Sequence, residues 1–374
     1  MSTFEVLTQR IKIEPHLNAD SIELGIFDGY VSIVKKGQYS TGDLVVYIPE
    51  ASVIPEWILK QQGFWDDTKN AGMLAGSAGN RVKAIKLRGV LSQGLVFPVR
   101  SIDDKFFIST PNGEIEVVEN QDVSGILGIT KYEPPIPACL AGEVAALPQY
   151  TLKYDIENYK KYPNVISEND KIVLSEKIHG TWCSLYYNKD LTHDELLNGN
   201  MFATSKGLSA QGLVLKYNDK NVNNAYNKTL EKMTDKLELL SEAFNSPVYI
   251  LGEVFGPIQD LRYGYSDIQF RVFDIFIGFP NNGFYLDKYT MVKVCEQLGL
   301  DTVPILYMGS FSKEKLQQFT DGTEQVSGNE CHIREGVVIN VIPEQNHFKL
   351  GRVVLKSVSE HYLTRKNKNA TEYN

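Results

Sequence analysis

The sequence has 374 residues, which predicts two or three domains at about 150 residues each. It is 43% hydrophobic and 22% charged, a composition typical of globular proteins that excludes wholesale disorder. No apolar run of about 18 residues is present, so we expect no membrane-spanning helix. The formal net charge of −8 by itself argues weakly against nucleic acid as a partner.

The cysteines and the first residues bear on the cellular compartment. The four cysteines are widely spaced and form no Cys-x-x-Cys pair, which argues against a disulfide scaffold or a cysteine-rich zinc site and for a reducing compartment. The start of the chain has neither the basic patch nor the apolar core of a secretion signal. We therefore expect a protein of the cytoplasm, or of the nucleoid or nucleus, and we expect it to be a monomer.

Short β-rich runs separated by Gly and Asp fill the first part of the chain. Examples lie at residues 30–34, 44–48 and 95–99. Short strands with this punctuation predict a small β-barrel or sandwich. Prolines at 134, 135, 137 and 148 cannot continue a helix or the middle of a sheet, so we interpret residues 132–150 as a linker. The predicted domains are residues 1–145 and 146–374.

Two stretches depart from the acidic average of the chain. One runs between residues 81 and 100 and contains no acid; its basic residues are Arg81, Lys83, Lys86, Arg88 and Arg100. The other begins at residue 345, where basic residues outnumber acids; they are Lys349, Arg352, Lys356, Arg365, Lys366 and Lys368. Either stretch is suited to contact phosphates, and a solvated surface is the alternative for each.

The second part of the chain mixes helix and strand signals. Apolar residues from 226 to 240 recur at spacings of four and three, which predicts a helix with one core face. We expect further helices over residues 287–298, ending at Gly299, and from Ser312 as N-cap onward. Runs rich in β-branched and aromatic residues predict strands at 248–255, 270–276, 336–339 and 353–356. This part is therefore expected to be an α+β domain.

The most informative stretch is residues 175–182, with the sequence Ser-Glu-Lys-Ile-His-Gly-Thr-Trp. Gly180 allows close backbone approach of a ligand. Lys177 becomes a nucleophile if its pKa falls through desolvation or nearby cations. On these residues alone, a surface lysine paired with Glu176 is the alternative. The loops that bind phosphates in P-loop and Rossmann proteins have no counterpart in the sequence.

Four apolar strands each carry a charged residue. Glu253, Asp274, Glu335 and Lys356 all lie within such runs, and the aromatic Phe273 precedes Asp274. Charges are almost never fully buried unless they are paired or ligating. The pattern favours one shared polar cleft over four independent charges at strand ends.

Taken in order, these segments resemble the nucleotidyltransferase motifs of ATP-dependent RNA ligases, a superfamily that includes DNA ligases and mRNA capping enzymes. The resemblance covers about residues 150–360 and rests on residues 177–180, 203–207, 251–253, 273–274, 335–338 and 355–357. Residues 81–96, with 18–23 upstream, are similar to the N-terminal OB-type domain of one RNA ligase subgroup. The implied fold is α+β: a small OB-like β-barrel followed by a ligase domain with an ATP-grasp-like antiparallel sheet.

The resemblance implies a reaction and a role for each motif residue. Lys177 would attack the α-phosphate of ATP to give lysyl-AMP, AMP would pass to an RNA 5′-phosphate, and a 3′-OH would then expel it. The implied nucleotide contacts are Glu176, Ile178, His179, Lys206, Glu253, Phe273, Glu335 and Lys356. Glu176 would accept from the adenine amino group, Phe273 would stack on the base, and Lys356 would neutralise the α-phosphate.

The implied partners are a metal ion and RNA. Mg²⁺ or Mn²⁺ would be held by Glu335, with Glu253 as a second candidate ligand. RNA, at a nick or as free ends, would be held by Arg81, Lys83, Lys86 and Arg88. The subgroup resemblance favours a nick with an RNA 3′-OH strand.

Three positions depart from the pattern of the superfamily. His179 stands where many members have Asp, which favours an RNA ligase but leaves no basis for a metal role here. Lys206 stands where Arg is usual, and Val354 replaces the first lysine of a Lys-x-Lys motif, with Arg352 the nearest other cation. The alternatives are a GTP-charged capping-type transferase and a nucleic-acid-binding protein with a decayed site.

Overall fold

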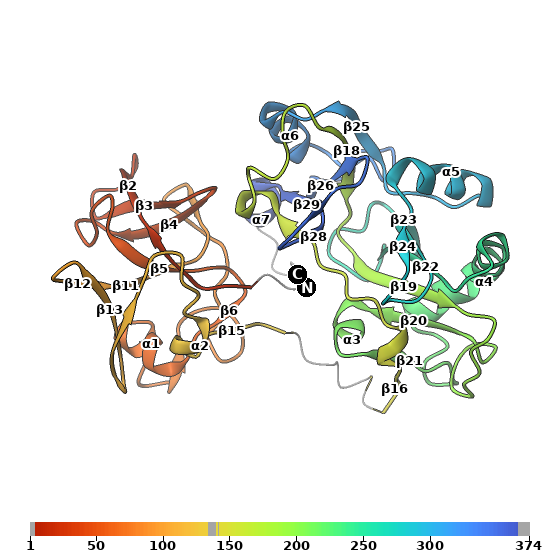
Figure 1. The fold of residues 1–374 in the computed structure, drawn as a ribbon, viewed down its shortest axis with the longest axis horizontal. Helices are drawn as coiled ribbons and strands as arrows, with labels where there is room; N and C mark the ends of the chain where they lie inside the picture. The colour runs from red at the N-terminus through yellow and green to blue at the C-terminus, as the bar shows by residue number, and fades with distance from the viewer. Residues whose placement is uncertain (1–3, 134–139, 141, 366–374) are drawn as a thin grey trace. The chain divides into compact units, whose positions relative to one another are not determined.

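The computed structural model describes residues 4–133, 140 and 142–365. Its contacts divide the chain into two units, residues 2–133 and residues 134–374 together with residue 1 (Figure 1). The division falls before the expected position near 145, because β16 (Val144–Ala146) pairs with β21 (Leu213–Leu215) of the second unit. The end of the expected linker is also structured, since Pro148–Tyr150 form a 3-10 turn; residues 134–139 and 141 lie outside the described part.

The first unit is built from short antiparallel strands and two short helices, and contains the OB fold. Its strands are β1 (Leu7–Arg10), β2 (Lys12–Pro15), β3 (Ile22–Phe27), β4 (Tyr30–Lys35), β5 (Leu44–Ile48), β6 (Ser52–Val53), β7 (Trp65–Asp66), β8 (Ala71–Gly72), β9 (Ile85–Leu87), β10 (Val90–Ser92), β11 (Leu95–Pro98), β12 (Arg100–Ile102), β13 (Lys105–Thr110), β14 (Gly113–Val117) and β15 (Thr130–Lys131). The helices are α1 (Glu56–Gln61) and α2 (Ser124–Leu127).

Strand β5 shows why the apolar run at 44–48 predicts a strand. It lies between β1 and β11, and all five of its residues are buried. Val46 and Ile48 enter one apolar cluster, while Val45 and Tyr47 enter another on the opposite face. A strand buried on both faces reads as a continuous apolar run rather than as an alternation.

The second unit combines strands and helices. Its remaining strands are β17 (Glu157–Asn158), β18 (Lys171–Lys177), β19 (Thr181–Tyr187), β20 (Met201–Ser205), β22 (Val248–Phe255), β23 (Gln269–Ile277), β24 (Phe284–Tyr285), β25 (Ile305–Ser310), β26 (Gly336–Ile342), β27 (Asn346–His347), β28 (Gly351–Arg352) and β29 (Val354–Val358). Its helices are α3 (Lys206–Ala210), α4 (Ala225–Phe244), α5 (Lys288–Leu298), α6 (Lys313–Thr320) and α7 (Glu360–Leu363), with a 3-10 turn at Tyr159–Lys161.

Two five-stranded sheets form the frame of this unit. We name the sheet with the order β17-β29-β26-β18-β25 the lysine sheet, and the sheet with the order β20-β19-β22-β23-β24 the glutamate sheet. Both are antiparallel except for the parallel pair β17 and β29. The expected antiparallel ligase sheet is confirmed, and it comes as two sheets.

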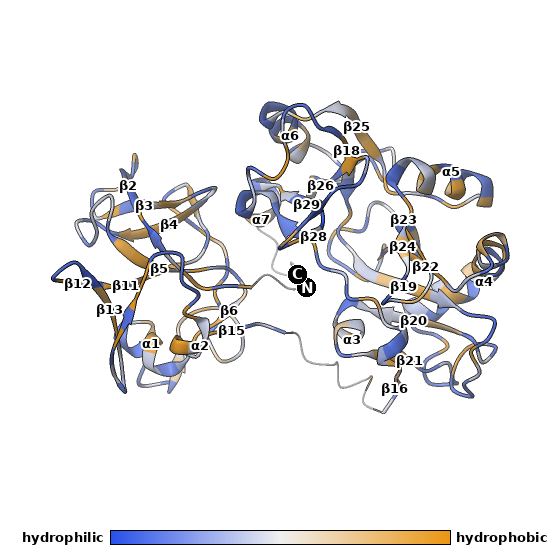
Figure 2. Ribbon diagram, in the orientation of Figure 1, coloured by the Kyte–Doolittle hydropathy of each residue, from blue (hydrophilic) through white to orange (hydrophobic). Residues whose placement is uncertain are grey.

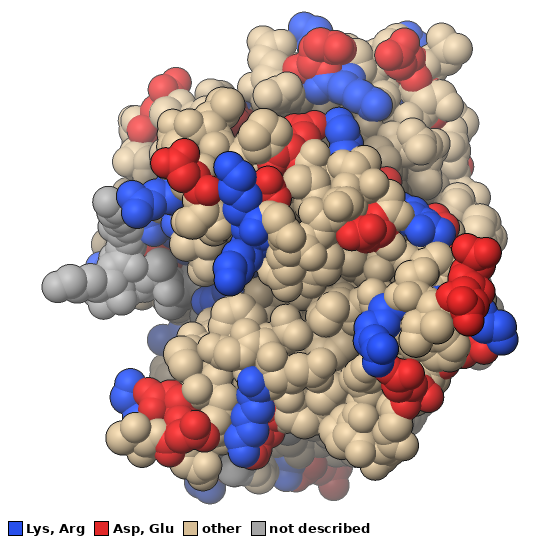
Figure 3. Space-filling model, turned by 90° about the vertical axis from the view of Figure 1, so that its left-hand side faces the viewer, with Lys and Arg blue, Asp and Glu red and all other residues tan. Residues whose placement is uncertain are grey.

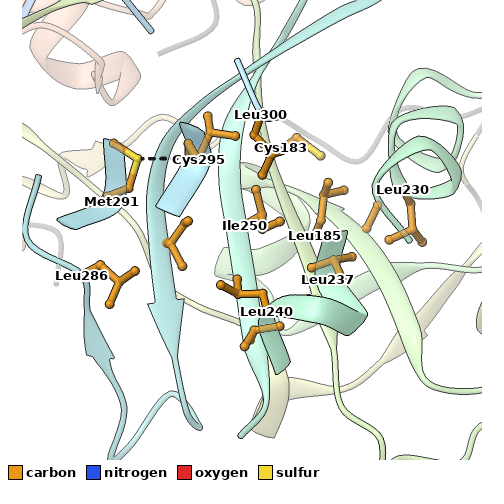
Figure 4. Packing of buried hydrophobic residues seen from close by; sticks show 14 of the residues in the cluster. Cys183, Leu185, Leu230, Leu237, Leu240, Ile250, Leu286, Met291, Cys295 and Leu300 are labelled. Atoms are coloured by element: carbon orange, nitrogen blue, oxygen red, sulfur yellow. Dashed lines mark hydrogen bonds between the residues drawn. The ribbon is translucent and has the colours of Figure 1, made fainter. Parts of the chain in front are cut away.

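Helices cover one face of each sheet. Leu230 and Leu237 of α4 and Met291 and Cys295 of α5 join residues of the glutamate sheet in one buried cluster (Figures 1 and 4). Both helices are amphipathic, with hydrophobic and hydrophilic residues alternating along the ribbon (Figure 2). Leu316 of α6 joins a second buried cluster on the lysine sheet. The opposite faces of the sheets are therefore free of these helices.

The three predicted helices are confirmed, as are the ends predicted for α5 and the predicted N-cap of α6. The Asp287 side chain accepts hydrogen bonds from two backbone N–H groups at the start of α5, and Gly299 ends it in the left-handed conformation. Ser312 caps α6 by accepting from the N–H of Lys315. None of the helices in the described part of the chain combines the length and apolar content that crossing a membrane requires.

Candidate active site

Two lysines project from the same face of the lysine sheet. Lys177 is the last residue of β18 and pairs with Gly336 of β26, while Lys356 of β29 pairs with Val338 of β26. Paired residues in neighbouring strands share a face, and successive residues along a strand point to opposite faces, so partners of residues 336 and 338 lie on the same face. The neighbouring Leu355 and Val337 lie in the core cluster behind the sheet, so both lysines point to the other side.

The remaining motif residues come from the glutamate sheet. Glu253 lies near the end of β22, Phe273 lies in β23, and Lys206 begins α3 directly after β20. The two sheets are joined by residues 178–180 alone where β18 of one leads into β19 of the other. The nucleophile candidate therefore stands at the crossing between the two sheets.

A buried ion pair holds the side chain of Lys177. Its Nζ lies 2.5 Å from Oε1 of Glu335, and the two side chains are 23% and 9% exposed. Burial alone would lower the pKa of Lys177, but the carboxylates of Glu335 and Glu253 outweigh it and raise this pKa above its ordinary value. The lowered pKa that would make Lys177 a nucleophile is therefore not present in the ligand-free protein, because the strongest neighbours of the amine are acids.

The other charges of the site are linked to this pair. Burial raises the pKa of Glu253 to about 8, against the nearby charge of Lys177. Burial, with Lys206 and Lys177 as neighbouring cations, lowers the pKa of Lys356 to about 8. Lys206 pairs with Asp155 at 2.9 Å, a partner that sequence reasoning did not identify because it belongs to no motif. These five charged motif positions and Asp155 thus form one electrostatic cluster, whereas Asp274, which was expected in the same cleft, pairs with Arg352 instead.

Glu176 has one satisfied and one unsatisfied carboxylate oxygen. Oε2 accepts a hydrogen bond of 2.8 Å from the backbone N–H of Gln325, and Nε of Arg334 lies 3.8 Å away. Oε1 is buried without a hydrogen-bond partner among the described residues. Burial raises the pKa of Glu176 to about 7. A buried acceptor without a partner is costly, so it marks a place where a ligand donor is favourable.

Glu335 and Glu253 form a donor set that fits a divalent cation. Carboxylate oxygens are the ligands that Mg²⁺ and Mn²⁺ prefer. Both acids act on the charge of Lys177, and burial, followed by the nearby charge of Glu335, raises the pKa of Glu253. Across the described residues, no group of three or more His, Cys, Asp or Glu side chains is arranged to hold a metal. The fit is to an ion that keeps waters and takes further ligands from phosphate.

The side chains directly after Lys177 make their contacts within the protein. Both ring nitrogens of His179 contact protein groups, Nε2 with Asp260 at 2.6 Å and Nδ1 with Tyr362 at 2.7 Å. The side chain of Ile178 lies in an apolar cluster with Phe255 and other residues. A Cβ at Gly180 would lie 2.4 Å from the carbonyl oxygen of residue 254, so this glycine admits β22 rather than a ligand.

Two of the basic residues after position 345, Arg352 and Arg365, are paired with acids. Arg352 donates two hydrogen bonds to Asp274, at 2.5 and 3.1 Å, and also pairs with Glu344. Arg365 pairs with Asp260 at 3.2 Å. Residues 366 and 368 lie outside the described part of the chain. One of the two acids that bind Arg352, Asp274, lies 78 positions away in the sequence, a contact that the sequence pattern could not indicate.

The predicted RNA-binding residues of the first unit fall into two kinds. Lys86 and Arg88 are exposed on the β9–β10 hairpin, whose turn is formed by Arg88 and Gly89 with φ angles of 49° and 94°. Lys83 is half-buried before that hairpin. Arg81 is also half-buried, and its guanidinium lies 4.3 Å from the ring centre of Tyr132. Only the hairpin residues are presented to solvent.

Comparisons with known proteins support this arrangement. The family model described as RNA ligase matches residues 170–358, and an OB-fold domain model matches residues 6–99. The solved structure of Naegleria gruberi RNA ligase with pyrophosphate is 25% identical, with a TM-score of 0.70, and the match covers 96% of this chain and 97% of that one. A mutant of the same ligase with ATP and manganese is 23% identical, with a TM-score of 0.69 and coverage of 96% and 98%. No curated protein sequence matches the chain.

The family model spans more than half of the chain and contains Lys177, Glu253, Glu335 and Lys356. The OB-fold match precedes it, in the order that the motifs predicted. The chain belongs to the RNA ligase family.

Proposed function

We propose that the chain is an ATP-dependent RNA ligase that seals an RNA 3′-OH to a 5′-phosphate at a nick, through lysyl-AMP and adenylylated RNA. The observation that carries this proposal is the position of Lys177, whose Nζ is 2.5 Å from Glu335 and is also influenced by Glu253 of the facing sheet. Family membership gives the reaction class, and the Naegleria gruberi structures with ATP, AMP and manganese support the nucleotide and metal.

In the first step, the Nζ of Lys177 attacks the α-phosphorus of ATP, an N–P bond forms, and the bond to pyrophosphate breaks. The amine must lose a proton to react, and the nearest acceptor is the carboxylate of Glu335 at 2.5 Å. Lys356 projects from the same face and would neutralise charge on the α-phosphate in the transition state. A divalent ion on Glu335 and Glu253 would add charge neutralisation when bound.

The base and sugar would be held by residues of both sheets. The unsatisfied Oε1 of Glu176 would accept from the adenine amino group. Phe273, whose ring centre lies 5.5 Å from that of Tyr154, would stack on the base. Lys206 and Glu253 would contact the ribose or phosphate side. His179 and Ile178 are left with a framework role, since their side chains are engaged within the protein.

The RNA contact of the first unit is assigned to the hairpin bearing Lys86 and Arg88. On the face displayed in Figure 3, basic side chains are interspersed with acidic ones and do not form a continuous basic patch. On this face, RNA binding is therefore expected to rest on a few local contacts rather than on a broad positive field.

The test is incubation of the full chain with α-labelled ATP and Mg²⁺ or Mn²⁺. We expect label to become covalently attached, to be absent in Lys177→Ala, and to be retained in Lys171→Ala, an exposed lysine on the same strand. Label that stays on Lys177→Ala would refute the nucleophile. Labelling by GTP but not ATP would support a capping-type transferase, and RNA binding without labelling under either metal would support a decayed site. Sealing assays on nicked and single-stranded RNA would then identify the substrate.

A further inference from the structure

Residues outside the ligase motifs form hydrogen bonds with the segment 178–180, which joins the two sheets. The backbone N–H of His179 donates to the hydroxyl of Tyr263 at 2.6 Å. The side-chain amide of Gln259 donates to the carbonyl of Gly180 at 3.0 Å. The segment therefore has fixed backbone contacts as well as a fixed side chain.

The ring of His179 is fixed by two partners at once. Asp260 accepts from Nε2, and a carboxylate has no proton to donate, so Nε2 carries the hydrogen. The neutral ring then accepts at Nδ1 from the hydroxyl of Tyr362 at 2.7 Å. The side chains of His179 and Asp260 are 4% and 2% exposed, and Tyr362 is 4% exposed, so water cannot easily replace these contacts.

Tyr362 and Arg365 come from the last described segment of the chain, beyond residue 358, where the RNA ligase match ends. Arg365 donates to Asp260 at 3.2 Å and to the carbonyl of Tyr362 at 2.9 Å, and its guanidinium lies over the Tyr362 ring at 3.9 Å. Asp260 thus receives hydrogen bonds from both His179 and Arg365. The cluster closes only when the chain after residue 358 is in place.

The same segment is anchored at its other end to the partner of Lys177. The backbone N–H of Ser359 donates to the carbonyl of Glu335 at 2.8 Å, and its hydroxyl donates to Asp321 at 2.7 Å. Residues 359–365 therefore run from Glu335, which pairs with Lys177, to His179, which follows Lys177. The contacts bracket the nucleophile from both sides.

We propose that Asp260, Tyr362 and Arg365 are positioning residues of the ligase: they hold residues 178–180 and so set where Lys177 lies relative to the α-phosphate and to the glutamate sheet. The cluster acts through its hydrogen bonds to His179. Because in-line attack demands close alignment, a displacement of about 1 Å at the nucleophile costs up to about 100-fold in rate. The inference rests on the assignment of Lys177 as the nucleophile.

The experiment uses the full chain with Tyr362→Phe, which removes one hydroxyl and keeps the ring. The control is His361→Ala, whose side chain is 78% exposed on the same helix. Single-turnover formation of lysyl-AMP is measured across ATP concentrations, with the midpoint of thermal unfolding for each protein. We expect Tyr362→Phe to lower the maximal rate about 10- to 100-fold while the half-saturating ATP concentration changes less than threefold. His361→Ala should match the wild type.

A maximal rate of folded Tyr362→Phe within twofold of the wild type overturns the inference. The inference is also overturned if the fall in maximal rate comes with weaker ATP binding and a lower midpoint of thermal unfolding, because Tyr362 then stabilises the fold in general. If Tyr362→Phe does not fold, Arg365→Lys, which keeps the charge but not the planar fork, gives the same comparison. If the wild type itself forms no lysyl-AMP, the proposed function fails rather than this inference.

Discussion

The pH dependence of adenylylation tests whether Glu176 meets the base. Burial raises the pKa of Glu176 to about 7, so about one tenth of the carboxyls are ionised at pH 6 and about nine tenths at pH 8. The oxygen without a partner, Oε1, accepts from an adenine amino group when it is ionised and opposes it as a donor when it is protonated. We therefore expect this group to raise kcat/KM for lysyl-AMP formation about ninefold between pH 6 and 8.

The variant Glu176→Gln isolates this effect. A glutamine keeps an acceptor oxygen but does not titrate, whereas the titrations of Lys177 and of ATP are common to both proteins. The ratio of wild-type to variant kcat/KM should therefore rise about ninefold over the same pH range. A flat ratio refutes the contact and leaves Glu176 as an acceptor for the N–H of Gln325 only.

The same group predicts a change in stability with a definite sign. Its pKa rises from 4.5 to about 7 on folding, so the native state binds more protons than the unfolded state between these values. The free energy of unfolding should fall as pH rises through this window, by up to about 3 kcal/mol. In urea unfolding, the free energy of unfolding of Glu176→Gln should not show this fall with rising pH. If the pH dependence is identical in the two proteins, the pKa of Glu176 is not raised by burial.

Three further changes test other parts of the site. Burial and neighbouring cations lower the pKa of Lys356 to about 8, so the rate of wild-type adenylylation should decline above pH 8 as this lysine loses its charge. Arginine stays charged, so Lys356→Arg should keep its own maximal rate over the same range. If the rates of both proteins decline in parallel, Lys356 does not neutralise the phosphate. Arg88→Ala should weaken RNA binding in filter-binding titrations and reduce the dependence of log affinity on log salt concentration by about one. Arg81→Ala should leave this salt dependence unchanged and lower the midpoint of thermal unfolding, because Arg81 packs on Tyr132. The reverse result would assign the RNA contact to Arg81 instead of Arg88. Asp274→Asn should lower the free energy of unfolding in urea by about 3 kcal/mol, because the buried charge of Arg352 is then only partly compensated. A loss below about 1 kcal/mol would show that Glu344 alone compensates the charge of Arg352.

Local sequence signals predict the elements well where burial and caps agree. The strand expected at 248–255 is β22 with the same bounds, because both of its faces are buried. The stripe from Tyr226 to Leu240 lies in α4, which buries Leu230, Leu237 and Leu240. The shortest helices were not predicted: α7 has four residues, and a stretch of that length carries no periodic signal.

The charged site was predicted in membership but not in electrostatics. The motif residues do gather, yet the pKa of Lys177 is raised because Glu335, which lies 158 positions away in the sequence, contacts its amine. Arg81 and Arg352 look available in the sequence, and each is engaged by a partner that only the fold supplies, Tyr132 and Asp274. Long-range contacts decide these outcomes, and spacing along the chain does not encode them.

The distribution of the motif residues over two sheets explains why a framework cluster matters in this fold. Lys177 and Lys356 belong to the lysine sheet, while Glu253 and Phe273 belong to the glutamate sheet. Each set is rigid within its own sheet because strand pairing fixes its register. The relation between the two sets is not fixed by pairing, and the direct covalent link from Lys177 to the glutamate sheet is residues 178–180. Residues 178–180 thus connect the two sheets as well as carrying motif residues, and the hydrogen bond that Tyr362 donates to His179 comes from α7, the helix after residue 358.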